Sequence, residues 1–547
     1  MADPATAEQA PPAKGSRLDS HMTRRPGAKS ITLFLLAVAG GLCFIAFNVA
    51  RDMKAVTVTN VWPYLLLGLA LLIALSFEFA NGFLDTANAV AMVIYTHSLD
   101  PTTAVVLSGF CNLAGVLASS GAVAFAIITL LPVDLILQVS SGSGYAMVFA
   151  LLIAAILWNM GTWWLGLPAS SSHTMVGSII GVGIANQLFN PHVGASGVDW
   201  EQAIKILKVL LISPFLGFTL AALVMVASKR LLKYPSLFKA PQNKQPPPWP
   251  IRTLMVITCT GVSFFHGSND GQKGMGLIML ILIGTVPTAY ALNHAVTAND
   301  IQQFIAASEQ AGHILDRHVA PSGKLNSSAR AEVTEYIRTQ KLQLDTILAL
   351  RELVGDVEHK VVQYKIIKAI PAQEQTIIRD DMYVTGEALR LIQKNDIRGV
   401  KENKSPVFNK DESAVLADYE SKLNKGTKFI PNWVKVAVAL ALGLGTMVGW
   451  KRVVITVGEK IGKEHLTYAQ GASAGLVTMC TIFAANTFGL PVSTTHILSS
   501  GVAGTMAAQG SGLRMSTIRN IAAVWVFTLP SAALLSGLLY WLFRAIS

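Results

Sequence analysis

The chain has 547 residues, of which 52% are hydrophobic and only 14% are charged. Soluble domains average roughly 25% charged residues, so this composition and the mean hydropathy of +0.48 predict a polytopic membrane protein and exclude a disordered chain or a disulfide-rich secreted module. The net charge of +11 lies outside residues 290–430, which hold 19 basic and 19 acidic residues, and its position in loops between apolar runs excludes a nucleic-acid-binding domain.

The first 60 residues contain two predicted elements. Residues 1–30 are rich in Ala, Pro and charged residues, which predicts a disordered N-terminal tail. The 19-residue apolar run Ile31–Val49 is long enough to cross a bilayer, so residues 31–60 are expected to hold an extra N-terminal transmembrane helix. A signal peptide is the alternative, and the long polar leader argues against it.

Two series of apolar runs, of similar total length, follow. Residues 61–228 contain a series of apolar runs, and a second series begins at 253–289 and resumes at 431–547. The linker 229–252 carries six Lys or Arg and no Asp or Glu, so the positive-inside rule predicts that it is cytoplasmic. Together the apolar runs predict an all-α polytopic membrane protein with roughly 10–12 transmembrane helices.

The second series is interrupted by a polar segment, residues 290–430. Apolar residues recur there at helical spacing within dense mixed charge, as at Ile347, Leu350 and Val354. This pattern is typical of amphipathic helices, so the segment is predicted to be a soluble helical insert.

The two series share two motifs. Asp85 lies in G-F-L-D-T-A-N-A and Asp270 in G-S-N-D-G-Q-K-G. Residues 166–173 read G-L-P-A-S-S-S-H and residues 489–496 read G-L-P-V-S-T-T-H. The aspartate and the histidine of each copy are 88 residues apart in the first and 226 in the second, a difference of 138 that is close to the 141 residues of the insert. Internal duplication with Gly- and Pro-interrupted segments is typical of secondary transporters, whose sites lie between the repeats.

These motifs give the chain a specific resemblance. The sequence resembles the Pit family of inorganic phosphate transporters, in particular the bacterial low-affinity, proton-coupled type. The resemblance covers about 61–547 and is carried by five segments, 81–95, 166–173, 266–276, 443–463 and 491–506. It implies two inverted repeats with broken helices and re-entrant hairpins, a multi-pass location in the bacterial inner membrane, and import of phosphate, either free or as a metal–phosphate complex, by symport with protons.

The paired aspartates are the first candidate site residues. A carboxylate at the bilayer centre costs ~2.5–3.5 kcal/mol on insertion scales, so Asp85 and Asp270 are expected to pair, to bind a cation or to carry a proton. Glycines beside both predict helix breaks, whose free N–H and C=O groups suit an anion and a cation. The structural alternative is a buried aspartate that caps a helix end.

The two copies differ in a way that bears on coupling. Aligned on the aspartates, Leu84 corresponds to Asn269, and Asn88 corresponds to Lys273. Sodium-using members of the resembled family commonly carry Asn at all four positions. An ammonium supplies no oxygen ligand, and Lys273 could pair with Asp270 one helical turn away, so proton coupling is favoured over the alternative of a sodium-coupled symporter. Lys273 could instead extend to an interface.

Hydroxyl groups after the two prolines are the second candidate set. They are expected to form a donor cradle for a tetrahedral oxyanion or, more simply, to cap helices: Ser170, Ser171, Ser172, Ser493, Thr494 and Thr495. Four further polar residues lie in or beside apolar segments and are candidates for a proton relay or for structural roles: Glu78, His173, His266 and His496.

Competing functions are weaker. A membrane enzyme with Ser/Thr–His catalysis lacks a G-x-S-x-G elbow and a third triad member, and an ion channel fits the paired repeats poorly. No cofactor and no metal ligands are predicted, and the four cysteines are predicted to be small core residues. The expected partners are inorganic phosphate, protons, a divalent metal if phosphate travels as its complex, and the lipid bilayer, with no nucleic acid; a homodimer stays open.

Overall fold

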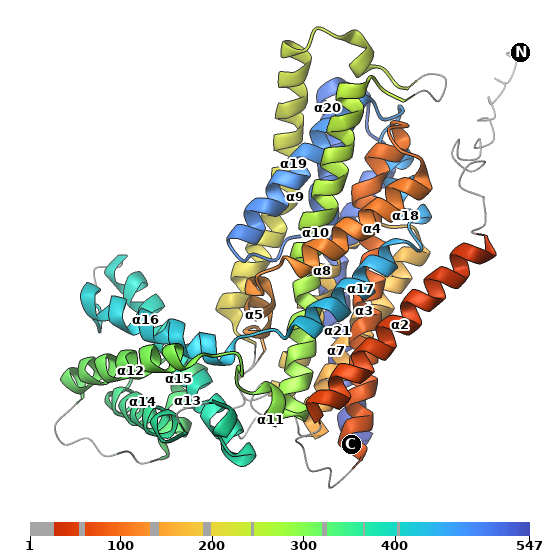
Figure 1. Ribbon diagram of the computed structural model, residues 1–547. Helices are drawn as coiled ribbons and strands as arrows, with labels where there is room; N and C mark the ends of the chain where they lie inside the picture. The colour runs from red at the N-terminus through yellow and green to blue at the C-terminus, as the bar shows by residue number, and fades with distance from the viewer. Residues whose placement is uncertain are drawn as a thin grey trace, which may run out of the picture.

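A computed structural model describes residues 27–53, 61–131, 142–189, 198–241, 246–319, 325, 327–364, 367–401 and 405–546. The disordered tail predicted for 1–30 lies almost wholly outside these residues, and the first described helix, α2, begins at Ala28. The described residues form an all-helical molecule, in which a bundle of long helices lies beside a smaller group of shorter ones (Figure 1).

The helices of the long bundle fall into two series. The first contains α2 (Ala28–Asp52), α3 (Trp62–Tyr95), α4 (Pro101–Leu117), α5 (Ala122–Ile128), α7 (Gly142–Trp164), α8 (Ser171–Phe189) and α9 (Trp200–Leu231), followed by the short 3-10 helix η2 (Pro235–Phe238). The second contains α10 (Trp249–Thr285), α17 (Asn432–Thr446), α18 (Lys451–Ile455), the π-helix η4 (Thr456–Lys460), α19 (Tyr468–Thr487), α20 (Thr494–Gln509) and α21 (Met515–Ile546).

Five of the described helices, α2, α3, α7, α9 and α21, are long and apolar enough to cross a membrane. The number rises to seven if the bent pairs α4–α5 and α16–α17, with angles of 74° and 71°, each count as one span. This is fewer than the ten to twelve passages expected, because that count included the short hairpin helices and divided α10 into two. The chain is nevertheless a multi-pass membrane protein with bent helix pairs, as predicted.

The helix breaks expected beside the two aspartates are absent. The helices α3 and α10 run without interruption through Asp85 and Asp270. Neither helix has a proline near its aspartate, and glycine alone is tolerated within a helix. The breaks lie instead between α4 and α5, where Gly121 has a φ of 89°, and at the Gly-Leu-Pro motifs, where Gly166 and Gly489 have φ values of 67° and 62°.

The two series pack as reciprocal halves. α3 packs against α17 of the second series, and α10 packs against α4 of the first. In the same way α9 packs against α20, and α21 packs against α8. α3 and α10 are antiparallel where they cross, since Glu78 lies beside Gly274 while Asp85 lies beside His266. The hairpins α7–α8 and α19–α20 meet at their tips, where the rings of His173 and His496 have centroids 4.4 Å apart.

Glycines at equivalent positions allow these helices to approach closely. A Cβ atom on Gly82 of α3 would collide with the carbonyl oxygen of Leu442 on α17. A Cβ atom on Gly267 of α10 would collide with the carbonyl oxygen of Asn112 on α4. Both glycines lie three residues before an aspartate, so each close contact fixes the height at which a carboxylate enters the bundle.

Gly82→Ala is therefore expected to lower the thermal unfolding temperature of the purified protein. Overpacking of this kind costs about 1–3 kcal/mol, because backbone atoms must shift. Gly68→Ala on the same helix is the matched control, since a Cβ at that position meets no atom within 4 Å. That control should be neutral or slightly stabilising, and equal unfolding temperatures for the two variants would contradict the role assigned to Gly82.

The polar segment forms the smaller group of helices. It contains α11 (Pro287–Tyr290), α12 (Ala298–His318), α13 (Ala329–Thr339), α14 (Leu344–Tyr364), η3 (Ile367–Ala369), α15 (Ala372–Lys401) and α16 (Lys410–Thr427). Capping boxes at Thr297 and Asn409 begin α12 and α16. The ion pair of Lys394 with Glu201, at 2.9 Å, joins this group to α9. Figure 1 shows this group at the opposite end of the bundle from the start of α10.

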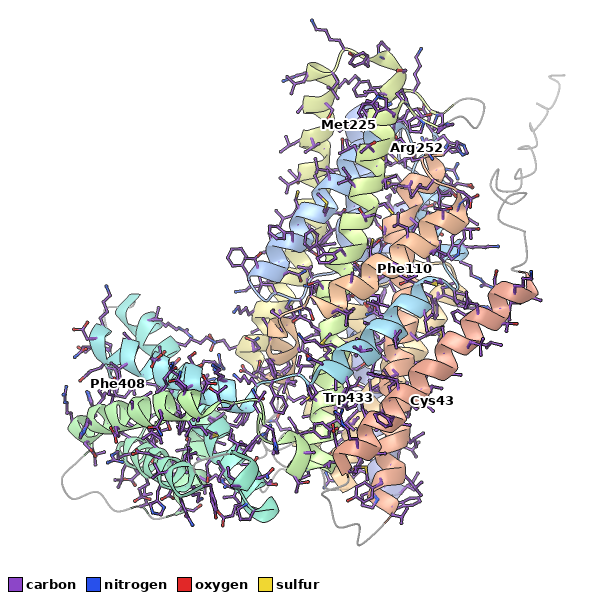
Figure 2. The ribbon with its side chains drawn as sticks, in the orientation of Figure 1. Cys43, Phe110, Met225, Arg252, Phe408 and Trp433 are labelled. Carbon is purple, nitrogen blue, oxygen red and sulfur yellow. The ribbon has the colours of Figure 1, made fainter. Side chains whose placement is uncertain are left out.

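The outer surface of the long bundle is apolar. Phe110 of α4 and Cys43 of α2 are both exposed there (Figure 2). The prediction that all four cysteines belong to the core is wrong for Cys43 and Cys480, which are exposed. Lipid is as apolar as a protein core, so hydropathy alone does not distinguish a buried position from a lipid-facing one.

Candidate functional site

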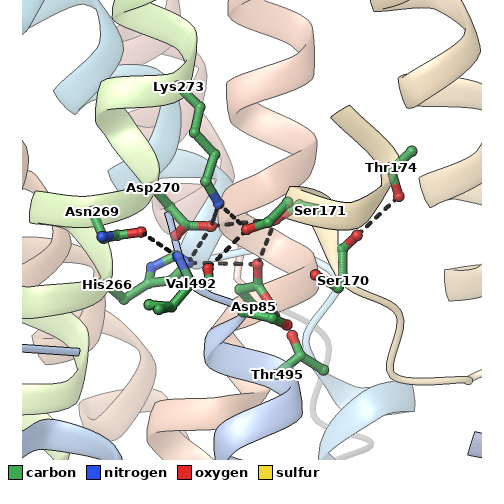
Figure 3. Close-up of polar contacts among 12 residues, drawn as sticks. Asp85, Ser170, Ser171, Thr174, His266, Asn269, Asp270, Lys273, Val492 and Thr495 are labelled. Atoms are coloured by element: carbon green, nitrogen blue, oxygen red, sulfur yellow. Dashed lines mark hydrogen bonds and ion pairs between the residues drawn. The ribbon is translucent and has the colours of Figure 1, made fainter. Parts of the chain in front are cut away.

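The crossing of α3 and α10 brings the two aspartates together at the hairpin tips. Asp85 and Asp270 are buried, with 3% and 1% of their surfaces exposed. Figure 3 shows both carboxylates facing the first turn of α8, with residues of α10 and α20 around them. Segments that are far apart in the chain thus converge on one buried polar cluster.

Each aspartate belongs to a small network, and the two networks match. Asn88 donates from Nδ2 to Oδ1 of Asp85, at 2.8 Å, and to the hydroxyl of Thr495, at 2.9 Å, while Thr495 also donates to Asp85. Lys273 donates from Nζ to Oδ2 of Asp270 and to the hydroxyl of Ser172, both at 2.5 Å. Asn88 corresponds to Lys273 and Thr495 to Ser172, so each aspartate meets the hairpin of the other repeat.

Ser171 links the two networks. Its hydroxyl lies 3.1 Å from Oδ2 of Asp85 and 3.2 Å from Oδ2 of Asp270. It is also the first residue of α8, where helix geometry leaves the initial amides without intrahelical acceptors. Ser172 donates to the carbonyl oxygen of Val492 at 2.8 Å, which joins the first hairpin tip to the second. The cluster therefore holds hydroxyl and amide donors beside two carboxylates and one ammonium group.

His266, one turn before Asp270 on α10, completes the cluster. Its Nε2 atom lies 3.5 Å from Oδ2 of Asp85 and 3.6 Å from Oδ2 of Asp270. Its Nδ1 atom lies 2.7 Å from Oδ1 of Asn112 on α4. The ligand atoms of Asp85, His266 and Asp270 all lie within 4.8 Å of one another, an arrangement that could hold a metal ion. The sequence predicted no metal ligands, because these residues come from two helices.

The serines that begin each hairpin motif have a capping role. The hydroxyls of Ser170 and Ser493 accept from the amides of His173 and His496, each at 3.2 Å. These bonds satisfy amides that the helix starts leave free, which is the simpler of the two roles considered for them. Thr494 is buried at the first position of α20.

The side chain of Asn269, on α10, bonds to residues of the second hairpin and not to the two carboxylates. Its Nδ2 atom donates to Oδ1 of Asn486, at 2.7 Å, and to the carbonyl oxygen of Leu490, at 3.1 Å. Its Oδ1 atom accepts from the amide of Val492 at 3.5 Å. The side chain thus holds the polar backbone of the Gly-Leu-Pro break, where unpaired groups would otherwise be left in an apolar region.

The other relay candidates occupy separate places. Glu78 is fully buried on α3 beside Gly274, and neither carboxylate oxygen has a hydrogen-bond partner among the described residues. The rings of His173 and His496 contact each other in a tilted arrangement, and His496 stacks on Trp525 with centroids 4.0 Å apart. The hydroxyl of Ser170 is 3.0 Å from Nδ1 of His173, but no carboxylate bonds to that ring within the described residues, so a catalytic triad is not formed there.

Three polar residues of this region were not singled out as site candidates. Asn112, Thr446 and Asn486 lie on α4, α17 and α19, and each bonds to a residue of another helix. Asn112 carries a weak signal, since it is a lone amide in an apolar segment. Thr446 carries none, because a threonine within an apolar helix is common.

The comparisons with known proteins agree with the resemblance. The phosphate transporter family, PHO4, matches residues 81–536. The low-affinity inorganic phosphate transporter PitB of Escherichia coli (strain K12) is 38% identical over 503 residues, which cover 88% of this chain and 97% of that protein. The low-affinity inorganic phosphate transporter PitA of the same organism is 40% identical over 497 residues, with coverages of 87% and 96%. A solved structure described as the sodium-dependent phosphate transporter is 20% identical, with a TM-score of 0.47, and covers 88% of this chain and 100% of that one.

Proposed function

This chain belongs to the phosphate transporter family, and we propose that it imports inorganic phosphate by symport with protons across the inner membrane of a bacterium. Its relatives are named as transporters, which sets aside a membrane enzyme. The observation that carries the coupling proposal is the buried ammonium of Lys273 on Asp270, where the first repeat has the amide of Asn88.

Lys273 supports proton coupling over sodium coupling. A sodium site needs several oxygen ligands, and the ammonium of Lys273 supplies none where the first repeat has the amide oxygen of Asn88. Lys273 is fully buried and lies 2.5 Å from Asp270, so it compensates one carboxylate permanently. Sodium therefore has one oxygen ligand fewer at that half of the cluster than at the other.

Glu78 is the proposed proton carrier. Its carboxyl group is fully buried, and its oxygens lack hydrogen-bond partners among the described residues. An unpaired carboxylate is costly in apolar surroundings, so a residue so placed is suited to taking up and releasing a proton during the transport cycle. Its position beside Gly274, the neighbour of Lys273, connects it to the charged cluster.

The charge of the cluster supports a metal–phosphate complex as the carried species. Two aspartates face one lysine, so carboxylates outnumber fixed cations even before Glu78 is counted. A bare phosphate dianion would be repelled by this excess, whereas a complex with a divalent cation is neutral. The amides of Ser171 and Ser172, which begin α8 and have no intrahelical acceptors, are then available to the phosphate oxygens, and the Ser171 hydroxyl would have to turn to them from the two aspartates.

The test is phosphate flux into proteoliposomes under separately imposed gradients. An inward proton gradient at constant sodium should drive concentrative uptake that a protonophore abolishes. An inward sodium gradient at fixed pH should drive none. Equal uptake under the two gradients would contradict proton coupling, and uptake that is unaffected by chelation of divalent cations would show that free phosphate is carried.

A further inference from the structure

We propose that Asp85, His266 and Asp270 form a binding site for a divalent cation, and that Asn112 is the residue that positions His266 to serve as its nitrogen ligand. The proposal rests on the proposed function only for the statement that the cation arrives with phosphate. The site itself is formed by contacts among α3, α4, α10 and α17.

A chain of hydrogen bonds fixes which nitrogen of His266 carries the proton. Thr446 donates its hydroxyl to the carbonyl oxygen of Leu442 at 2.8 Å, so that hydroxyl accepts from Nδ2 of Asn112 at 3.2 Å. With its amide nitrogen committed, Asn112 presents Oδ1 to His266, and only a protonated Nδ1 can donate to it at 2.7 Å. In the neutral ring, Nε2 therefore carries the lone pair.

That lone pair points at the two carboxylates without a hydrogen bond. The distances of 3.5 and 3.6 Å from Nε2 to Oδ2 of Asp85 and Asp270 exceed the 2.7–3.2 Å of an N–H···O bond. Nε2 has no hydrogen-bond partner among the described residues, although His266 is 97% buried, with 3% exposed. A buried acceptor aimed at two anions is unfavourable, so either a proton on Nε2, which would make His266 an imidazolium beside both aspartates, or a metal ion must lie there.

The separations of His266 from the two aspartates match ligands that share an ion, and the ligand atoms of the two aspartates lie within 4.8 Å of each other. Two atoms that are each about 2.0–2.2 Å from a tetrahedral metal ion lie about 3.3–3.6 Å apart. The 3.6 Å separation is to Oδ2 of Asp270, which also accepts from Lys273 and Ser171, so a metal ion would replace one of these donors or would bind Oδ1, which has no partner among the described residues. Three protein ligands also leave one position open, and a phosphate oxygen can take it. One imidazole and two carboxylates suit divalent zinc, manganese or cobalt.

Asn112 then acts as a metal-site positioning residue. A histidine ligand usually donates its second N–H to an oxygen, which fixes the ring and its tautomer. Gly267 lets α4 lie against α10 at this level, since a Cβ there would meet the carbonyl of Asn112. The close packing of the two helices thus supplies the partner that the ligand requires.

The experiment measures binding of Co²⁺ alone to the full-length protein in lipid nanodiscs, without phosphate or any gradient. Visible absorption of the bound ion reports an ordered site of low coordination number. We expect His266→Ala to weaken Co²⁺ binding at least 100-fold, and Asn112→Leu to weaken it about 10–100-fold, the range for loss of an outer-shell partner. Asn112→Asp keeps an acceptor for Nδ1 and should restore the affinity.

Ser108→Ala is the matched control for Asn112→Leu. Ser108 lies one turn earlier on α4 and bonds to Ser263 of α10, at 2.8 Å, outside the proposed site. It should leave Co²⁺ affinity within twofold. If Asn112→Leu does not fold, Thr446→Val, which frees the Asn112 amide to rotate, should still lower the affinity several-fold.

Two results would overturn the proposal. One is wild-type protein that does not bind Co²⁺, or whose binding survives His266→Ala. The other is an Asn112→Leu variant with a lowered unfolding temperature and unchanged Co²⁺ affinity, which would make Asn112 merely structural. Either result could accompany normal proton-driven phosphate flux, and a Co²⁺ site could be present without such flux, so failure of this proposal is distinguishable from failure of the proposed function.

Discussion

Asp85→Asn and Asp270→Asn should each abolish concentrative phosphate uptake in proteoliposomes. Asp85 accepts hydrogen bonds from Asn88, Thr495 and Ser171, and an amide can neither accept all three nor balance a cation. A hydrogen bond to a charged group contributes about 1.5–3 kcal/mol, so the loss of one corresponds to a rate lower by roughly 10- to 150-fold. We expect the uptake rate of each variant to be at least this many fold below the wild-type rate.

The control for both variants is Asp100→Asn. Asp100 caps α4 by accepting from the amide of Thr102 at 3.0 Å, and asparagine caps helices equally well. This variant should transport at the wild-type rate. Wild-type uptake by Asp85→Asn or Asp270→Asn would reduce that aspartate to a structural role.

The two aspartate variants should differ in stability. Removal of the Asp270 charge leaves the ammonium of Lys273 fully buried without its partner, and breaking a buried ion pair in this way costs about 3–5 kcal/mol. Removal of the Asp85 charge leaves no lysine without its ion-pair partner. Asp270→Asn should therefore unfold at the lower temperature, and thermal unfolding of the purified proteins measures this.

The correspondence between residues of the two halves could be predicted from the sequence because both halves carry the same motifs. Equal spacing, once the insert is removed, identified Asp85 with Asp270 and one Gly-Leu-Pro motif with the other. An aspartate in an apolar segment is costly enough to mark a site by itself. The i,i+3 spacing also predicted the contact of Lys273 with Asp270, which the structure shows at 2.5 Å.

Contacts between helices could not be predicted in this way. A glycine in an apolar helix is compatible with a break or with close packing, and only the position of Leu442 shows which applies at Gly82. Likewise, Asn269 resembles an ion ligand in the sequence, but its partner Asn486 lies 217 residues away. The bond of His266 to Asn112 depends on how α4 crosses α10, and no spacing rule describes that crossing.

Lys273→Asn should change the coupling ion. The substitution removes the ammonium that lies on Asp270 and Ser172, and it gives the second repeat the amide that Asn88 supplies in the first. Oxygens of the amide, of Ser172 and of Asp270 could then surround sodium. We expect proton-driven uptake to fall at least tenfold and uptake to become dependent on sodium, measured as phosphate flux with each gradient imposed alone.

Three further variants separate this explanation from simple damage. Lys273→Met removes the charge without adding an oxygen, so it should lose uptake without any response to sodium. Lys205→Asn, at an exposed position on α9, should change neither. Leu84→Asn tests the other difference between the repeats: Leu84 packs with Ala80 and Phe83 in an apolar cluster, so an amide there should lower stability without adding a sodium response.

The charge argument makes the Lys273→Asn result decisive. In the wild type the ammonium of Lys273 compensates the Asp270 carboxylate throughout the transport cycle, so that carboxylate needs no sodium ion. In the variant the Asp270 carboxylate has no fixed cation beside it, so it must bind a cation from solution in every cycle. At neutral pH sodium is far more abundant than protons. A variant with unaltered pH dependence and no sodium response would mean that Lys273 does not occupy a cation's place, and wild-type uptake driven equally well by sodium would contradict the argument at its premise.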